Sequence, residues 1–127
     1  MATIAILEDE PALRVLFQRV LERSGHAVVT YGDGVSALTG ILADPPAVFV
    51  TDFHVPGLKG LEVVARLRAD PRTAAVRCIL LTGSGEPDVV GSDAVGDYDA
   101  CLAKPVEIDR LVEVVEACLP TSKQSSA

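Results

Sequence analysis

Five short apolar runs alternate with five segments of helical character along the chain, and this alternation restricts the possible folds more than any other feature. The apolar runs cover residues 3–7, 27–30, 48–51, 78–82 and 100–103. Near-continuous apolar strands separated by helices are typical of a parallel sheet that is covered on both faces, with right-handed crossovers. The sequence therefore predicts an α/β fold, a three-layer (βα)5 doubly wound parallel sheet.

The predicted helices have recognisable ends and inner faces. Pro11 suits the first position of a helix that Gly25 ends, and Asp33 can cap the next helix. The helix capped by Asp33 is expected at residues 35–43, and three further helices are expected at 60–69, 88–95 and 107–119. Apolar residues at helical spacing are expected to face the sheet: Leu13, Leu16, Phe17, Val20, Leu21, Val35, Leu38, Ile41, Leu42, Leu61, Val64, Leu67, Ile108, Leu111, Val112 and Val115.

Length and composition exclude several classes of protein. The 127 residues are expected to form one domain over residues 1–120, followed by a disordered polar tail at 121–127. A net charge of −7 argues against direct nucleic acid binding, which needs a basic face. No apolar run approaches the roughly 18 residues of a membrane helix, and the N-terminus lacks signal-peptide features. Because the three cysteines show no metal-ligand spacing, we expect reduced thiols in a cytoplasmic protein that does not bind membranes.

Four predicted strands end in polar groups that can do chemistry. Glu8 and Asp9 follow the first strand, Asp52 the third, Thr82 the fourth and Lys104 the fifth. These groups should converge, because the carboxyl ends of parallel strands share one edge of the sheet. Carboxylates suit Mg²⁺ and can accept a phosphoryl group, whose oxygens a lysine and a hydroxyl can hold. Taken singly, the acids could be first-turn residues, the threonine a cap and the lysine a solvated loop residue.

Four motifs carry a family resemblance: ILEDEP, VTDFHVPGLKG, ILLTG and CLAKP. In this order and spacing they resemble the receiver domain of bacterial two-component response regulators, of the chemotaxis CheY type, over roughly residues 2–119. The resemblance implies a flavodoxin-like sheet with strand order 2-1-3-4-5. It also implies a switch rather than a classical enzyme, limited to self-phosphorylation from a phosphodonor and to autodephosphorylation.

The resemblance also assigns roles at the shared edge of the sheet. Asp52 would be the phosphoacceptor. Mg²⁺ would be held by Asp9, by Glu8 directly or through water, by Asp52 and by the main-chain carbonyl of His54. Lys104 would pair with the phosphoryl oxygens.

The part of the site that would respond to phosphorylation follows the family pattern at two positions and departs from it at a third. Thr82 would hydrogen-bond a phosphoryl oxygen and move when it arrives, and the Lys104–Pro105 bond would be cis. Receiver domains usually carry Tyr or Phe three residues before the lysine, where this chain has Cys101. Tyr98 lies three residues earlier, which along an extended strand is the opposite face. The predicted switch therefore runs through backbone and loop shifts alone, or uses a different output face.

Glycines and histidines near the motifs lead to further expectations. Gly83, Gly85 and Gly91 predict a mobile loop and fourth helix, because glycine weakens a helix interior. His54 could gate water at the mouth of the site, or could be an exposed loop residue. His26 is expected at the surface with no assignable partner.

The resemblance implies a phosphorylation-dependent signalling switch. A histidine kinase or a histidine phosphotransfer protein would phosphorylate Asp52 with Mg²⁺, and the output would be binding to an unidentified downstream protein. A stand-alone monomer is expected. The alternatives are a receiver inside a larger hybrid kinase or regulator, a phosphorylation-independent interaction module, and a Mg²⁺-dependent hydrolase. The hydrolase is disfavoured because His54 stands where such enzymes usually carry a second acid.

Overall fold

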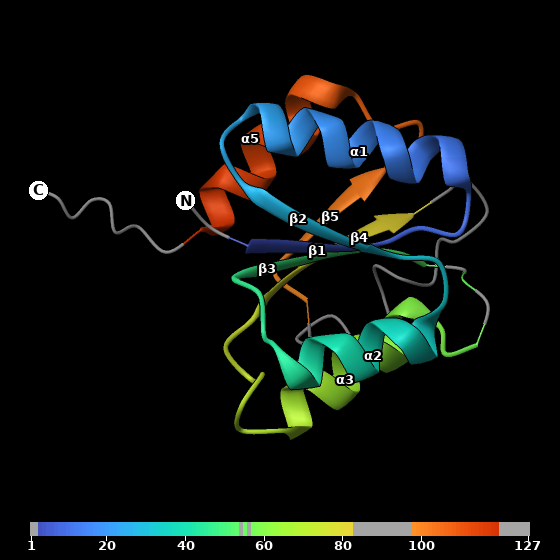
Figure 1. The fold of residues 1–127 in the computed structure, drawn as a ribbon, viewed down its shortest axis with the longest axis vertical. Coiled ribbons are helices and arrows are strands. Elements are labelled where there is room, and N and C mark those ends of the chain that lie inside the picture. Colours follow the sequence, from blue (N-terminus) through green and yellow to red (C-terminus); the bar gives the residue numbers. More distant parts are fainter. Residues whose placement is uncertain (1–2, 54, 56, 83–97, 120–127) are drawn as a thin grey trace, which may run out of the picture.

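A five-stranded parallel sheet forms the centre of the protein, with the strand order β2-β1-β3-β4-β5 (Figure 1). The computed structural model describes residues 3–53, 55, 57–82 and 98–119. The elements along the chain are β1 (Thr3–Leu7), α1 (Pro11–Arg23), β2 (Ala27–Tyr31), α2 (Gly34–Ala43), β3 (Val48–Asp52), α3 (Gly60–Ala69), β4 (Arg77–Thr82), β5 (Ala100–Ala103) and α5 (Ile108–Cys118). The predicted fold class and strand order are confirmed. The helix expected at 88–95, the loop glycines before it and the tail at 121–127 lie outside the described residues.

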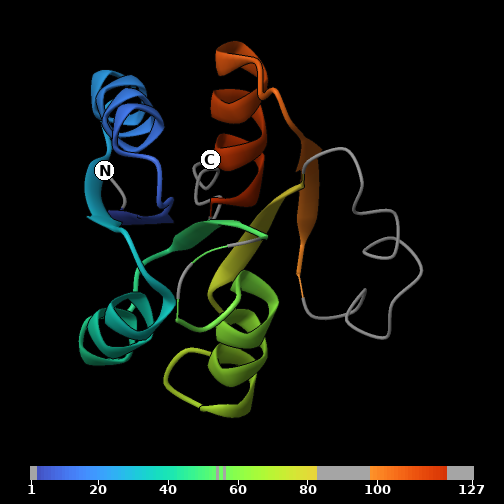
Figure 2. The same cartoon turned by 90° about the vertical axis from the view of Figure 1, so that its right-hand side faces the viewer.

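Helices cover both faces of the sheet. Figures 1 and 2 show α1 and α5 on one face and α2 and α3 on the other. Leu7 of β1 lies in register with both Tyr31 of β2 and Thr51 of β3, and Asp52 with Leu81 of β4. The carboxyl ends of these strands therefore lie level along one edge. Among the described helices, none has the length and apolarity needed to span a membrane.

Alternate residues of the central strands contribute to two separate core clusters. Ile4 and Ile6 of β1 pack on the side of α1 and α5, while Ala5 and Leu7 pack on the side of α2 and α3. The fully or almost fully buried partners of β1 in these clusters include Phe17, Leu21, Val50, Leu111 and Val115 on the first side and Phe49, Val63, Val64 and Leu67 on the second. Burying each such side chain contributes about 1.5–3 kcal/mol, so both helical layers stabilise the sheet.

The ends of the helices follow the local chemistry of the sequence. Pro11 begins α1, and Gly25 follows its end with φ of 99°, a left-handed conformation that favours glycine. The Asp33 carboxylate accepts a hydrogen bond from the main-chain N–H of Ser36 at 2.8 Å, which confirms its predicted capping role.

Two residues predicted to face the sheet are exposed instead. Leu16 of α1 is 42% exposed and Val35 of α2 is 55% exposed. Fully buried residues in these helices recur at a spacing of four, such as Phe17 and Leu21 in α1, and Leu16 lies about 100° around the helix from Phe17. The apolar face of α1 is therefore wider than the face that the sheet covers.

His26 contradicts the expectation of a surface residue without a partner. Its side chain is only 10% exposed, and its Nε2 lies 3.4 Å from Oε2 of Glu116 in α5. The two residues are 90 positions apart in the sequence, so the contact depends on the packing of α1 beside α5. No local pattern could have predicted it.

Asp99 connects the start of β5 to β4 and α3. Its carboxylate accepts hydrogen bonds from Nη2 of Arg68 at 2.8 Å, from Nη1 of Arg77 at 3.2 Å and from the main-chain N–H of Cys78 at 2.8 Å. Its own N–H donates to the carbonyl of Cys78 at 2.8 Å. This junction fixes the edge strand that leads to Lys104.

Candidate functional site

The candidate site lies at the carboxyl edge of the sheet. Glu8 directly follows β1, and Asp52 is the last residue of β3. Since Leu7 pairs with Thr51 in the parallel register, the next residue of each strand must also be adjacent. Lys104 directly follows β5, whose pairing with β4 brings it to the same edge.

Three carboxylates meet at this edge. Glu8, Asp9 and Asp52 can each direct one oxygen so that all three oxygens lie within 4.8 Å of one another. Glu8 is 1% exposed and Asp52 is 7% exposed, whereas Asp9 is open to solvent. Two acids are therefore held in a nearly buried position, and the third can reach a ligand from the solvent side.

Lys104 supplies a positive charge to the buried pair. Its Nζ lies 2.7 Å from Oδ1 and 2.8 Å from Oδ2 of Asp52, and 3.5 Å from Oε1 of Glu8. Oε2 of Glu8 accepts a hydrogen bond from the main-chain N–H of Glu10 at 3.1 Å. One ammonium group thus contacts two of the three carboxylates, so the acids of the cluster outnumber its cation.

The protonation equilibria reflect this imbalance. The pKa of Glu8 is raised to about 7. Burial is the largest cause and the neighbouring Asp52 adds to it, while the Glu10 N–H and the charge of Lys104 act in the opposite direction. Burial alone would lower the pKa of Lys104, but its hydrogen bond to Asp52 and the charges of Asp52 and Glu8 outweigh this, so it is raised. Lys104 is therefore charged at neutral pH, and a second cation would relieve the remaining repulsion.

The acidic cluster has the donor chemistry that a magnesium ion needs. Carboxylate oxygens are hard ligands, and Mg²⁺ binds proteins through one or two of them while it retains water and substrate oxygens. The exposed position of Asp9 leaves room for such ligands. The residues present therefore fit a magnesium ion.

Close packing of α3 against the end of β3 positions Asp52. A side chain at Gly60, the first residue of α3, would collide with the main-chain oxygen of Asp52 and would lie 2.8 Å from Oγ1 of Thr51. The N–H of Gly60 donates to the carbonyl of Phe53 at 3.3 Å, and the N–H of Phe53 donates to Leu81 at 3.0 Å. Sequence reasoning missed this role of Gly60, although a glycine at a helix start eight residues after the acid was a possible signal.

The residues expected to respond to phosphorylation lie beside this cluster. Thr82 ends β4, and its Oγ1 lies 3.9 Å from Sγ of the exposed Cys101. The main-chain N–H of Lys104 donates to the carbonyl of Thr82 at 2.7 Å, and the Lys104–Pro105 bond is cis. His54, with the carbonyl expected to bind metal, lies outside the described residues.

The predicted placement of Tyr98 was wrong. Ala100 and Leu102 pack on the α1 and α5 side, so Cys101 points to the other side. Tyr98 packs there as well, against the cluster under α2 and α3. Burial raises the pKa of Tyr98, and the charge of Cys101 contributes. The prediction failed because Tyr98 precedes β5, where strict alternation does not hold.

Residues 4–116 match the sequence profile of the response regulator receiver domain family. The chain belongs to this family. Members are receivers of bacterial two-component signalling and are phosphorylated by histidine kinases. The resemblance carried by the four motifs is therefore confirmed at the level of the family, while the individual site roles stay predictions.

Similar proteins differ in how much of their length the chain covers. It is 26% identical over 117 residues to sporulation initiation phosphotransferase F of Bacillus subtilis, covering 92% of the chain and 93% of that protein. It is 34% identical over 108 residues to the transcriptional regulatory protein TcrA of Mycobacterium tuberculosis, covering 85% of the chain but 42% of that protein. The chain thus spans nearly all of one relative and less than half of the other.

Solved receiver structures share the fold. A putative response regulator from Chloroflexus aurantiacus has a TM-score of 0.85 at 26% identity, covering 92% of this chain and 96% of that chain. Response regulator protein TrrA of Thermotoga maritima, in complex with Mg²⁺-BeF, has a TM-score of 0.83 at 27% identity, covering 94% of this chain and 100% of that chain.

Proposed function

We propose that this receiver accepts a phosphoryl group on Asp52 in a Mg²⁺-dependent reaction and signals through protein–protein contacts. The observation that carries the proposal is the Asp52 carboxylate at the end of a buried strand, bound by Lys104 at 2.7 and 2.8 Å and grouped with Glu8 and Asp9. A nucleophilic carboxylate, a cation partner and hard metal ligands are the groups that phosphoryl transfer to an aspartate needs.

Each residue of the cluster has a defined task in this reaction. An Asp52 oxygen attacks phosphorus while the bond from phosphorus to the donor breaks, that is, the N–P bond of a phosphohistidine or the O–P bond of acetyl phosphate. Lys104 and the Thr82 hydroxyl would bind the transferred oxygens. Glu8, Asp9, Asp52 and the His54 carbonyl would hold Mg²⁺, which neutralises charge on the phosphoryl group. Water later attacks phosphorus, which releases phosphate and restores the carboxylate.

The phosphodonor would be a histidine kinase or a histidine phosphotransfer protein. An apolar pocket of about 130 Å³ adjoins the site and is lined by Leu13, Leu16, Phe17, Lys104, Pro105 and Val106. The exposed Leu16, which the sheet does not cover, belongs to this pocket. An apolar surface beside the reactive carboxylate suits a donor that must dock before it transfers.

The output would be a population shift between two conformations, read by an unidentified downstream protein. We expect a monomer in the cytoplasm that does not bind nucleic acid. A receiver inside a larger hybrid kinase or regulator would use the same chemistry. The alternative without this chemistry is a phosphorylation-independent interaction module. Such a module would not need a carboxylate held by Lys104, so the observed pair disfavours it.

Intact mass spectrometry after incubation with acetyl phosphate and Mg²⁺ tests the proposal. The wild type should gain one phosphoryl group, and neither the Asp52→Asn variant nor the wild type in EDTA should gain any. An unmodified wild type, together with no binding of beryllofluoride in the presence of Mg²⁺, would contradict the phosphoacceptor role and favour the interaction module.

A further inference from the structure

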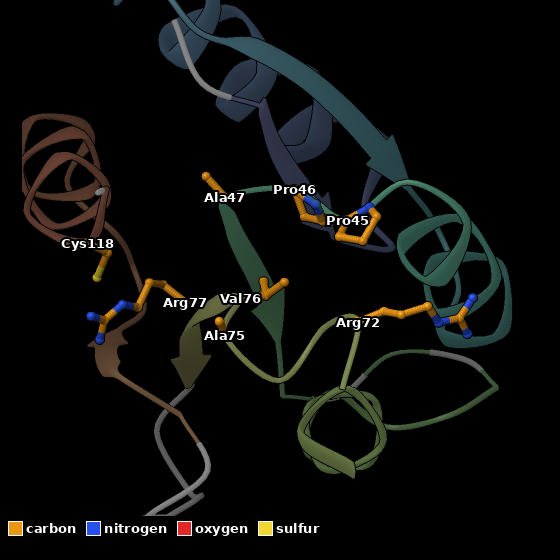
Figure 3. A pocket seen from close by; sticks show the side chains of 8 residues that line it. All are labelled: Pro45, Pro46, Ala47, Arg72, Ala75, Val76, Arg77 and Cys118. Atoms are coloured by element: carbon orange, nitrogen blue, oxygen red, sulfur yellow. The ribbon is translucent and has the colours of Figure 1, made fainter. Parts of the chain in front are cut away.

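A second pocket lies at the amino-terminal edge of the sheet (Figure 3). Ala47, which lines it, directly precedes β3, whereas Asp52 ends that strand, so the pocket and the phosphorylation site lie at opposite ends of β3. The pocket has a volume of about 380 Å³. The connections before β3 and β4, the first residue of β4 and the last turn of α5 all contribute to it. It is unrelated to the site proposed above.

The pocket combines apolar walls with positive charge. Pro45 and Pro46 form one wall, and Ala75 and Val76 form another. The guanidinium groups of Arg72 and Arg77 lie at opposite ends of the pocket in Figure 3. Among the described residues that line it, none is acidic, although the whole chain carries a net charge of −7. This reversal of the overall charge favours an anion with an apolar body.

Arg77 can bind such an anion directly. Its Nη1 donates to Asp99 at 3.2 Å, and within the described part of the chain no acceptor faces its Nε or Nη2. The side chain is 59% exposed. Asp99 also accepts hydrogen bonds from Arg68 and from Cys78 N–H, so this carboxylate is shared rather than devoted to Arg77. The guanidinium is thus oriented by Asp99, while Nε and Nη2 have no acceptor within the described part of the chain.

Arg72 contributes charge rather than a free binding group. Its Nε and Nη2 donate to the two carboxylate oxygens of Asp70 at 3.2 and 2.9 Å, a bidentate arrangement. Bidentate binding of an anion would require Arg72 to leave Asp70. We therefore expect Arg77 to be the main anchor.

Cys118 completes the pocket beside Arg77 (Figure 3). Burial raises the pKa of its thiol, the charge of Asp99 adds to this, and the charge of Arg77 acts against it. The thiol is therefore neutral at physiological pH and presents a polarizable, apolar surface. Its sulfur also reports on occupancy, because a bound ligand would shield it from reagents.

We propose that this pocket binds a small organic carboxylate, which pairs with Nε and Nη2 of Arg77 and lays its apolar body against the walls formed by the prolines and by Ala75 and Val76. Planar bidentate pairing with a carboxylate is the interaction for which a guanidinium is best suited. An inorganic anion would lack the apolar contact, and a neutral aromatic compound would lack the ion pair.

Titration of the full chain with 1-naphthoate, followed by amide NMR spectra, tests the proposal. Shift changes should saturate and centre on the amides of residues 47, 75–77 and 118. The neutral analogue 1-naphthamide should bind at least about tenfold more weakly, because it cannot form charge-assisted hydrogen bonds with Arg77. Inorganic phosphate should also bind at least about tenfold more weakly, because it has no apolar body to bury. Arg77→Gln should weaken naphthoate binding about 10- to 100-fold. Arg110→Gln, which removes an exposed arginine of α5, should leave it unchanged.

Alkylation of Cys118 supplies a second measurement that needs no substitution at Arg77. In a Cys101→Ser background, saturating naphthoate should slow the reaction of Cys118 with iodoacetamide, and naphthamide should not. Equal protection by both compounds, shift changes scattered over the surface, or unaltered affinity in a folded Arg77→Gln variant would each overturn the proposal. None of these results depends on Asp52.

Discussion

Replacing Glu8 by Gln should stabilise the metal-free protein at neutral and alkaline pH. Glu8 is 1% exposed and lies beside Asp52, and its contacts with the Glu10 N–H at 3.1 Å and with Lys104 at 3.5 Å do not offset the cost of burying its ionised carboxylate. Burial, the largest cause, raises its pKa from 4.5 to about 7. Because a glutamine has no proton to lose, the variant should escape the cost of ionisation.

The size and sign of the effect follow from the same pKa. A group whose pKa is higher in the folded state binds more protons when folded, so stability falls as pH rises between the unfolded and folded values. For Glu8 the window runs from about 4.5 to about 7. A difference of about 2.5 in pKa corresponds to roughly 3 kcal/mol. At about pH 8 the variant should therefore be more stable than the wild type by about 2–3 kcal/mol.

Urea unfolding in EDTA at about pH 5 and about pH 8 measures this difference. Glu10→Gln is the matched control, because Glu10 is an exposed acid two positions away. The control should follow the pH dependence of the wild type, and Glu8→Gln should follow a flatter curve. Mg²⁺ should stabilise the wild type more than Glu8→Gln, because the variant lacks a ligand carboxylate. Parallel curves for all three proteins would refute the account of Glu8.

Three further substitutions test other parts of the structure. Lys104→Met should slow phosphorylation by acetyl phosphate on the order of 100-fold, measured by intact mass against time, because it removes the cation bound to Asp52. Gly60→Ala should lower the free energy of urea unfolding by about 1–3 kcal/mol and also slow phosphorylation, because its methyl group would collide with the main chain of Asp52. Asp99→Ala should lower the unfolding free energy by about 2–4 kcal/mol, because three donors lose their shared acceptor.

Each substitution has a control on the same helix or of the same residue type. Lys59→Met removes an exposed lysine and should leave the phosphorylation rate unchanged. Ala65→Gly, at an exposed position of α3, should cost about 1 kcal/mol without slowing phosphorylation. Asp109→Ala, in the exposed first turn of α5, should cost less than about 1 kcal/mol. If a variant and its control gave the same result, the structural role assigned to Lys104, Gly60 or Asp99 would be contradicted.

The sequence predicted the fold well because the patterns that determine it are local. Every described strand and helix lies within one or two residues of its predicted bounds, since apolar runs, Pro11, Gly25 and Asp33 mark the ends. The gathering of Glu8 and Asp52 followed from parallel topology alone. A polar residue directly after an apolar strand can be identified from the sequence without knowing any distance in the structure.

The predictions failed where a residue's environment depends on contacts that are distant in sequence. The partner of His26 is Glu116, which lies 90 positions away in the sequence. Leu16 is apolar but belongs to a surface pocket, because the sheet covers only part of α1. Helical and strand periodicity identifies which residues share a face. It does not specify how much of that face another element covers.

The most direct test of the central claim is to locate the phosphoryl group. Borohydride reduces an acyl phosphate to the alcohol, so a phosphorylated aspartate becomes homoserine and can be found by peptide mass spectrometry. After treatment with acetyl phosphate and Mg²⁺, homoserine is expected at position 52 and at none of the other acidic positions. Homoserine at position 9 in place of Asp9, or at no position in a fully folded sample, would contradict the assignment of Asp52 as the phosphoacceptor.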